Sequence, residues 1–168
     1  MRPLGVATLQ LEVVTEISPE IADLVVRAVA TYPNHHVEIA IDTIGGDWAA
    51  SLAIYTALAN HKRRVTAHCV KAASSGALIA MSADIRHLDP AGHFFLHMPS
   101  GPTATSAQLD KIADAKAAMM ASRCRIPAKR IRLWMEKNTF IPAQRALQYG
   151  LVDAVPGLVK PELPVVFL

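Results

Sequence analysis

The sequence predicts an α/β domain in which helices flank a parallel sheet. Residues 35–42 alternate apolar and polar side chains, and residues 63–70 form a second apolar run; both patterns are typical of strands. Each run is followed by a segment with apolar residues at helical spacing, and this repeated order of strand and helix indicates a parallel sheet. The chain has 168 residues, 52% of them apolar and 18% charged, which suits one domain with a substantial core. We expect a single domain over residues 1–168, with its core at about 14–155.

The elements follow from local signals along the chain. Ser18 precedes a proline and a series of apolar residues at helical spacing, so a helix should begin there. Two short strands are expected at 84–90 and 93–99, each closed by a proline. The other expected helices are 48–59, a small-residue helix from 74, and helices at about 106–122, 127–138 and 142–150.

Composition and charge exclude several classes of function. The formal net charge of +3 is mild, and the basic residues within 123–132 have no aromatic side chains between them, so we predict an exposed helix face rather than a nucleic-acid surface. No apolar run approaches the length of a membrane span, and the first residues lack the apolar stretch of a secretory signal. The two cysteines, Cys69 and Cys124, suit a reducing compartment. We therefore expect a cytoplasmic protein with no membrane span and no nucleic-acid partner.

Two corners rich in small residues carry the candidate site. The turn 41–46, IDTIGG, ends a strand and precedes a helix, so backbone N–H groups near Gly45 and Gly46 can point into a site. The segment 71–84, KAASSGALIAMSAD, makes a similar corner one unit later. Its adjacent serines have two readings: a nucleophile at the corner, or small residues that cap a closely packed helix. His97, at the end of an expected strand, is placed to lie beside both corners.

Four segments, taken in order, resemble the caseinolytic (Clp) serine peptidase family, the proteolytic subunits of ATP-dependent Clp proteases and their phage relatives. They are the glycine turn IDTIGG, the serine segment KAASSGALIAMSAD, the histidine segment HFFLHMP and the closing segment RALQYGLVDAV. The resemblance runs from about Val14 to Val155. It implies a ClpP/crotonase-like fold of repeated β-β-α units, with a parallel sheet flanked by helices and a helical handle.

The resemblance assigns roles to four positions. It makes Ser74 the nucleophile, His97 the general base, and the backbone N–H groups of Gly46 and Ser75 the oxyanion hole. This division suits the chemistry, because a serine hydroxyl needs a base to accept its proton and the developing oxyanion needs prearranged donors. The implied activity is that of a serine endopeptidase, which cleaves peptides or unfolded chains through an acyl-enzyme.

The pattern departs from the family at the third catalytic position, where Asn138 stands in place of an aspartate. An amide oxygen can accept the imidazole N–H, but it carries no charge to stabilise the imidazolium, and the same replacement in a trypsin-like protease lowers turnover about 10⁴-fold. Three outcomes stay open: a slow Ser-His-Asn peptidase, an enzyme that recruits another carboxylate such as Glu136, or a catalytically silent subunit kept for assembly.

Two other enzyme classes share parts of this pattern. Crotonases use paired backbone N–H groups on a similar fold to hold an acyl-CoA thioester enolate, which would make the serine and the histidine incidental. Serine–lysine peptidases would use Lys71, which we expect to face solvent. His93 and His97 are four residues apart, and on a strand that spacing separates them by about 13 Å, too far for a shared metal. No metal and no cofactor are predicted.

The resemblance also implies partners and substrates. A homo-oligomeric ring is expected, acting on peptides or unfolded proteins. The segment between His97 and Met120 is about two helical turns shorter than the handle of typical members, which puts a stacked double ring in doubt. The N-terminal segment leaves little chain for the axial loops that contact AAA+ ATPases, so that partner stays open. Apolar residues near the cut are expected, because Phe94, Met98 and Ile112 would line the site.

Overall fold

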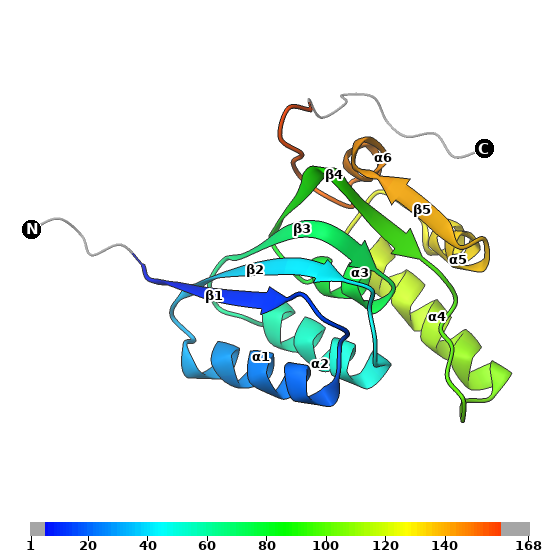
Figure 1. Ribbon diagram of the computed structural model, residues 1–168, viewed down its shortest axis with the longest axis horizontal. Helices are drawn as coiled ribbons and strands as arrows, with labels where there is room; N and C mark the ends of the chain where they lie inside the picture. Colours follow the sequence, from blue (N-terminus) through cyan, green and yellow to red (C-terminus); the bar gives the residue numbers. More distant parts are fainter. Residues whose placement is uncertain (1–5, 159–168) are drawn as a thin grey trace, which may run out of the picture.

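The computed structural model describes residues 6–158. They build a five-stranded sheet in which neighbours in sequence are also neighbours in space, in the order β1-β2-β3-β4-β5 (Figure 1). Strands β1 to β4 run parallel, and β5 pairs antiparallel with β4. The strands are β1 (Thr8–Val13), β2 (His36–Thr43), β3 (Val65–Ala73), β4 (Ile85–Leu96) and β5 (Thr139–Pro142).

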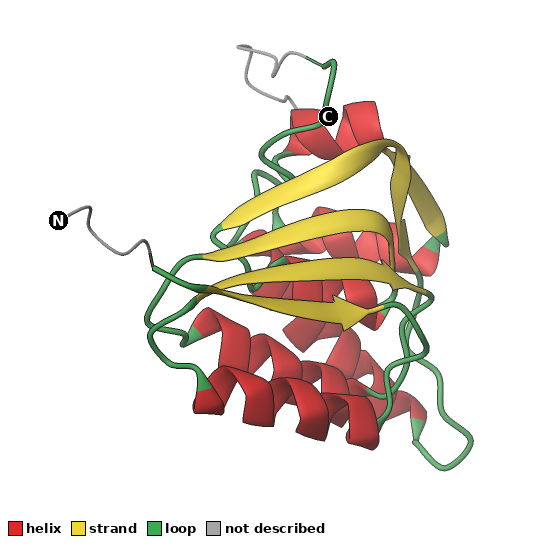
Figure 2. Ribbon diagram, turned by 60° about the vertical axis from the view of Figure 1, so that its left-hand side comes forward, coloured by secondary structure: helices red, strands yellow, loops and turns green. Residues whose placement is uncertain are grey.

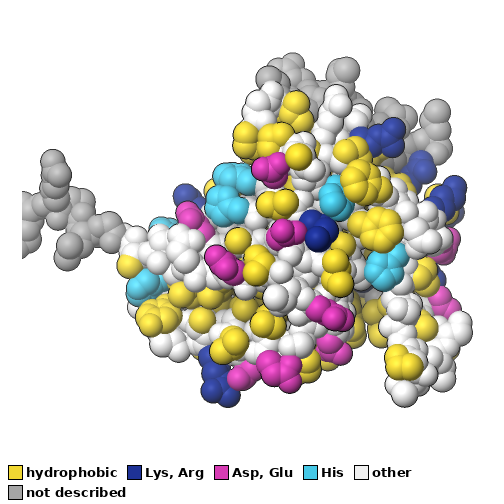
Figure 3. All heavy atoms as spheres, in the orientation of Figure 1, with side chains coloured by type: hydrophobic (Ala, Val, Ile, Leu, Met, Phe, Trp, Pro, Cys, Tyr) yellow, Lys and Arg dark blue, Asp and Glu magenta, His cyan; other side chains and the backbone are white. Residues whose placement is uncertain are grey.

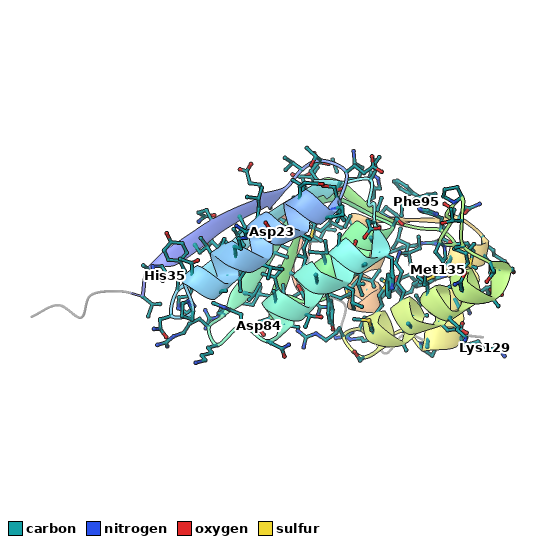
Figure 4. All side chains as sticks on the ribbon, turned by 90° about the horizontal axis from the view of Figure 1, so that it is seen from below. Asp23, His35, Asp84, Phe95, Lys129 and Met135 are labelled. Atoms are coloured by element: carbon teal, nitrogen blue, oxygen red, sulfur yellow. The ribbon has the colours of Figure 1, made fainter. Side chains whose placement is uncertain are left out.

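Helices cover one broad face of the sheet. The helices of the described residues are α1 (Pro19–Thr31), α2 (Trp48–Ala59), α3 (Ser75–Ala80), α4 (Ser106–Ala121), α5 (Ala128–Glu136) and α6 (Ala143–Tyr149). Helices α1, α2 and α4 lie beneath the sheet, while the opposite face of β1 to β3 carries no helix from the described part of the chain (Figures 2 and 4). The expected α/β class, with a parallel sheet flanked by helices, is confirmed.

The alternating sequence of β2 explains this one-sided layering. Val37, Ile39 and Ile41 point toward the helices and are at most 1% exposed, whereas the residues between them are half-buried on the open face. The side chains of α2 at Ile54 and Leu58 pack against this face of the sheet as part of the same core cluster. Burial of these branched apolar side chains is the main stabilising contribution, since each contributes about 1.5–3 kcal/mol when removed from water.

Helix ends fall where the sequence signals placed them. The Ser18 hydroxyl accepts from the Ile21 N–H at 3.4 Å, and the Asp47 carboxylate accepts from the Ala50 N–H at 2.7 Å, so α1 and α2 each begin with a capping side chain. Gly150 follows α6 with a φ of 72°, the left-handed conformation in which glycine ends helices.

Three features of the sheet differ from the sequence-based expectation. Residues 84–90 and 93–99 were each expected to end at a proline, but they contribute to one strand, β4, and Pro90 lies within it. The β3–β4 pairing passes from Cys69 opposite Leu88 to Lys71 opposite His93, so residues 89–92 bulge out of the ladder. Proline has no N–H to donate to a ladder, and it is tolerated in a bulge because the bulged residues are not paired. Strands β1 and β5 were not expected at all, although β1 alternates as TLQLEV.

Two further findings bear on the expected function. Within residues 6–158, no helix combines the length and the apolar character needed to cross a membrane. The same residues contain no group of three or more histidine, cysteine, aspartate or glutamate side chains that could hold a metal ion.

Candidate active site

The carboxyl ends of the parallel strands meet at one edge of the sheet, the position where such sheets commonly place their sites. β2 leads into the glycine turn, β3 leads into Ser74, and β4 leads into His97. The arrowheads of β1 to β4 in Figure 1 mark this edge. Figure 4 shows Phe95 at this end of the molecule and His35 at the opposite end. The three segments singled out from the sequence therefore approach one another in space.

Ser74 forms the corner between β3 and α3 in an unusual backbone conformation. Its φ is 51° and its ψ is −117°, a combination that side-chain-bearing residues rarely adopt and that costs on the order of 1–3 kcal/mol. Its N–H donates to the Phe95 carbonyl at 2.7 Å, which ties the corner to β4. The residue is 9% exposed, and its hydroxyl has no hydrogen-bond partner among residues 6–158. A strained corner of this kind between a strand and a helix is how hydrolases present a nucleophilic serine.

The glycine turn packs directly against this corner. A Cβ atom at Gly45 would lie 2.6 Å from Ser74 Cβ, and the φ of Gly45 is 102°, so a side chain is excluded by both contact and conformation. Gly46 is equally confined, because a Cβ there would lie 2.2 Å from the Ile17 carbonyl oxygen. The Thr43 hydroxyl accepts from the Gly45 N–H at 3.1 Å and donates to the Thr15 carbonyl at 2.5 Å. The turn is therefore braced from the chain that precedes α1.

Two backbone N–H groups beside Ser74 are available to a ligand. In the part of the chain that the structure describes, neither Gly46 N–H nor Ser75 N–H donates a hydrogen bond. The Ser75 hydroxyl donates to the Gly46 carbonyl at 3.3 Å, which holds the glycine turn and the serine corner together. The Ser75 side chain thus has a structural role, and the unbonded hydroxyl at the corner is that of Ser74.

His97 follows the last residue of β4 and is half-buried. Its ring packs on Phe95, with the ring centroids 5.8 Å apart. Its Nδ1 atom lies 2.7 Å from the carbonyl oxygen of Met98. In the described structure no hydrogen bond joins the His97 ring to Ser74. The two residues follow paired positions of the sheet, because Ala73, one residue before Ser74, pairs with Phe95, two residues before His97.

Asn138 reaches the same edge through β5. Leu96 of β4 pairs with Thr139 of β5, so the antiparallel register extended by one residue brings Asn138 opposite His97. Asn138 is exposed and has a φ of 49°, and its N–H donates to the Met135 carbonyl at 3.2 Å. Asparagine tolerates this left-handed conformation better than most residues, so the backbone alone gives a reason for it at the end of α5. Its side chain makes no hydrogen bond within the described residues, and its catalytic role stays a prediction.

The other charged groups considered from the sequence are engaged elsewhere. Glu136 lies 3.4 Å from Arg132 in an ion pair. Lys71 lies 3.5 Å from Asp42 across β2 and β3 and is partly exposed, as expected. The His93 ring stacks on Phe140.

Titratable groups in the sheet are perturbed mainly by burial. Burial raises the pKa of the Cys69 thiol to about 12, so this cysteine stays protonated and is a poor nucleophile at neutral pH. Burial and the neighbouring Lys71 ammonium lower the pKa of His93 below its usual value. Histidine side chains lie across the face shown in Figure 3, including the open face of the sheet.

One expectation about the site walls is wrong, and several site features were missed. Phe94 has no exposed surface, so it cannot contact a substrate; the alternation along β4 gives that place to Phe95. The bracing of the glycine turn by Thr15 and Ile17, and the contact of His97 with the Met98 carbonyl, were also not foreseen. These contacts use backbone atoms, which leave no signal in residue types.

Comparison with known proteins agrees with this architecture. The structure is similar to that of ClpP1 from Listeria monocytogenes, with a TM-score of 0.81 and 20% sequence identity; the match covers 87% of this chain and 89% of that chain. At this identity the likeness establishes the fold. The family model described as Clp protease matches residues 6–157, nearly the whole described chain. The chain therefore belongs to the Clp protease family.

Proposed function

We propose that this protein is a serine endopeptidase that cleaves peptides or unfolded chains, with Ser74 as nucleophile and His97 as general base. The observation that carries the proposal is the Ser74 corner: a strained, non-glycine residue with an unbonded hydroxyl, packed against a glycine turn. The N–H groups of Gly46 and Ser75 donate no hydrogen bond within the described residues. A corner that served only to pack a helix would have no need of this strain, because an ordinary capping serine adopts extended backbone angles.

The reaction follows from these positions. His97 takes the proton of the Ser74 hydroxyl as its oxygen attacks the scissile carbonyl carbon, and the resulting oxyanion accepts from the N–H groups of Gly46 and Ser75. His97 then returns the proton to the leaving amine, and water hydrolyses the ester with the same histidine as base. The hydrogen bond from Ser74 to His97 has to form when substrate binds, and such bonds are often long or misaligned in free enzymes.

Turnover should be slow, because Asn138 brings no negative charge to the neighbourhood of the His97 imidazolium. Asn138→Asp places a carboxylate opposite His97 in the β4–β5 register, so we expect it to raise kcat for peptide cleavage. The loss of about 10⁴ seen for the reverse change in a trypsin-like protease sets the upper limit of this gain. A cleavage rate that does not rise would exclude position 138 from contact with the imidazolium.

Covalent labelling tests the nucleophile directly. A fluorophosphonate probe should modify Ser74 in the native protein, and peptide mapping by mass spectrometry should locate the adduct there. Ser74→Ala should abolish the adduct, whereas Ser75→Ala, which removes only the hydroxyl bonded to Gly46, should retain it. An unlabelled native protein would instead support the catalytically silent subunit.

We also infer a homo-oligomeric ring from the outer surface of the α1–α2 layer. An apolar groove lies between these helices, lined by Val26, Trp48, Leu52 and Ala53 among others. α2 is apolar around its whole circumference, although only one side of it packs on the sheet, and such helices are usually covered on all sides. Light scattering should give a mass at least three times that of the 18.1 kDa chain; a monomer at micromolar concentration would contradict this inference.

The acyl-CoA alternative predicts a different ligand for the N–H groups of Gly46 and Ser75. A crotonase-type enzyme would bind a CoA ester there without forming a bond to Ser74. Titration calorimetry with a CoA thioester should therefore show no binding, while the fluorophosphonate adduct forms. Binding without an adduct would favour the alternative.

A further inference from the structure

The contact between His97 and Met98 determines where the imidazole proton lies. His97 Nδ1 is 2.7 Å from the Met98 carbonyl oxygen, a normal hydrogen-bond length. A carbonyl oxygen has no proton to donate, so Nδ1 must carry the hydrogen. In the neutral imidazole the lone pair then lies on Nε2. This is the tautomer in which Nε2 can act as a general base toward a serine hydroxyl.

The Met98 carbonyl therefore occupies the chemical position that a carboxylate holds in a triad. It fixes the tautomer and restrains the ring, but it carries no full charge. The side chain of Asn138 makes no hydrogen bond to the ring within residues 6–158. The ring of His97 is thus oriented by the backbone carbonyl of the next residue along the chain, Met98.

Met98 is in turn held by Arg132 of α5. Arg132 donates from Nη2 to Asp110 at 2.6 Å and from Nε to Asp114 at 3.0 Å, both on α4, and it forms an ion pair with Glu136 at 3.4 Å. The same Nη1 atom that pairs with Glu136 also contacts the sulfur of Met98. The Arg132 side chain is only 20% exposed, although its carboxylate partners lie at the surface. A planar guanidinium with several donors is suited to link three segments in this way.

We propose that Arg132 is a positioning residue for His97: it holds Met98 between α4 and α5, and the Met98 carbonyl orients the imidazole in its Nδ1–H form without help from Asn138. The inference rests on His97 being the general base of the proposed function. It also links α4 to the catalytic edge, because Asp110 and Asp114 belong to that helix.

The tautomer of His97 tests this proposal without any need for turnover. Long-range ¹H–¹⁵N correlation spectra of ¹⁵N-histidine-labelled full-length protein distinguish protonated from unprotonated ring nitrogens, and His97→Gln identifies the signal. The native protein should show Nδ1–H with an unprotonated Nε2. Asn138→Gly, which keeps the left-handed backbone but removes the amide, should leave this pattern unchanged. An Nε2–H signal in the native protein, or a change of tautomer in Asn138→Gly, would overturn the proposal.

Arg132→Met should convert His97 to a mixture of tautomers and lower kcat by about tenfold or more with little change in KM, since small displacements of a catalytic group have effects of this size. Arg132→Lys keeps the charge but loses the planar fork, so it should restore part of the native tautomer and part of kcat. It also provides the test if the methionine variant is unstable. Lys129→Met on the exposed side of the same helix is the matched control and should behave as the native protein. Unchanged tautomer and kcat in both Arg132 variants would refute the role of Arg132. An Nδ1–H signal in a protein whose Ser74 resists fluorophosphonate would support the orientation of His97 and count against the peptidase function alone.

Discussion

Lys116 offers a quantitative test of how helix α4 packs. It lies on the buried side of α4 with Ala113, Ala117 and Met120, and it is only 2% exposed. It forms no ion pair among the described residues, and burial alone lowers the pKa of its ammonium from 10.5 to about 8. A buried cation without a carboxylate partner destabilises the fold, so replacing it with an uncharged side chain of similar length should stabilise the protein.

The size and the pH dependence of this effect follow from the two pKa values. The difference between 10.5 and about 8 corresponds to about 3 kcal/mol at neutral pH, since one pKa unit is worth about 1.4 kcal/mol. The unfolded state binds the proton more tightly, so the stability of the native protein rises as the pH increases from about 8 toward 10.5. Lys116→Met should therefore raise the free energy of unfolding by about 2–3 kcal/mol at pH 7, and by less than about 1 kcal/mol at pH 10.

Urea unfolding followed by circular dichroism at pH 7 and pH 10 measures both quantities. Lys111→Met is the matched control: Lys111 is exposed on the same helix, and its replacement should change the free energy of unfolding by no more than about 0.5 kcal/mol at either pH. If Lys116→Met leaves the stability at pH 7 unchanged or lowers it, the ammonium is stabilised in the folded protein, and the reasoning from burial is wrong.

Three further predictions concern the serine corner, a buried ion pair and Lys71. Gly45→Ala should abolish labelling of Ser74 and destabilise the fold by about 1–3 kcal/mol, because the new Cβ would lie 2.6 Å from Ser74 Cβ at a φ of 102°. The labelling rate and urea unfolding measure these two effects. A variant that is stable and still labelled at Ser74 would contradict the prediction. Asp153→Asn should lower the free energy of unfolding by about 3 kcal/mol in urea unfolding. Arg86 is 7% exposed and bonds both carboxylate oxygens of Asp153, so it would lose its counter-charge. A loss below about 1 kcal/mol would show that the ion pair is well solvated. Lys71→Ala should leave peptide cleavage unchanged, since the ammonium pairs with a carboxylate on the open face of the sheet, and a large loss of cleavage would revive the serine–lysine mechanism.

The serine corner and the glycine turn were accessible from the sequence because their chemistry is local. Ser74, Gly45 and Gly46 each lie within four residues of the end of an expected strand, and small residues before a helix are a signal in themselves. The relation of His97 to Asn138 was inferred only through the family resemblance. It depends on β5, a four-residue strand that begins directly after Asn138 and whose short sequence gives no periodic pattern.

The orientation of His97 could not have been read from residue types. The acceptor is a backbone carbonyl, and every residue has one. The same holds for the N–H group of Ser75, whose role came from the resemblance, whereas the glycine turn itself indicated N–H groups near Gly46. The burial of Lys116 leaves no signal in the sequence for a different reason: lysine is seldom fully buried, so nothing marks this one as an exception.

The bulge around Pro90 connects the irregular part of the sheet to the chemistry at its edge. Before the bulge, β4 residues pair with β3 residues 19 positions earlier, as in Cys69 with Leu88; after it, the offset is 22, as in Ala73 with Phe95. Without this change of three residues, Ala73 would face Gly92, and His97 would lie about 10 Å farther along the strand, at about 3.3 Å per residue. That distance exceeds any hydrogen bond to Ser74. The extra residues of β4 therefore set the alignment of the base with the nucleophile, which explains why a strand interrupted by proline and glycine, an unfavourable choice for a sheet interior, leads into the site.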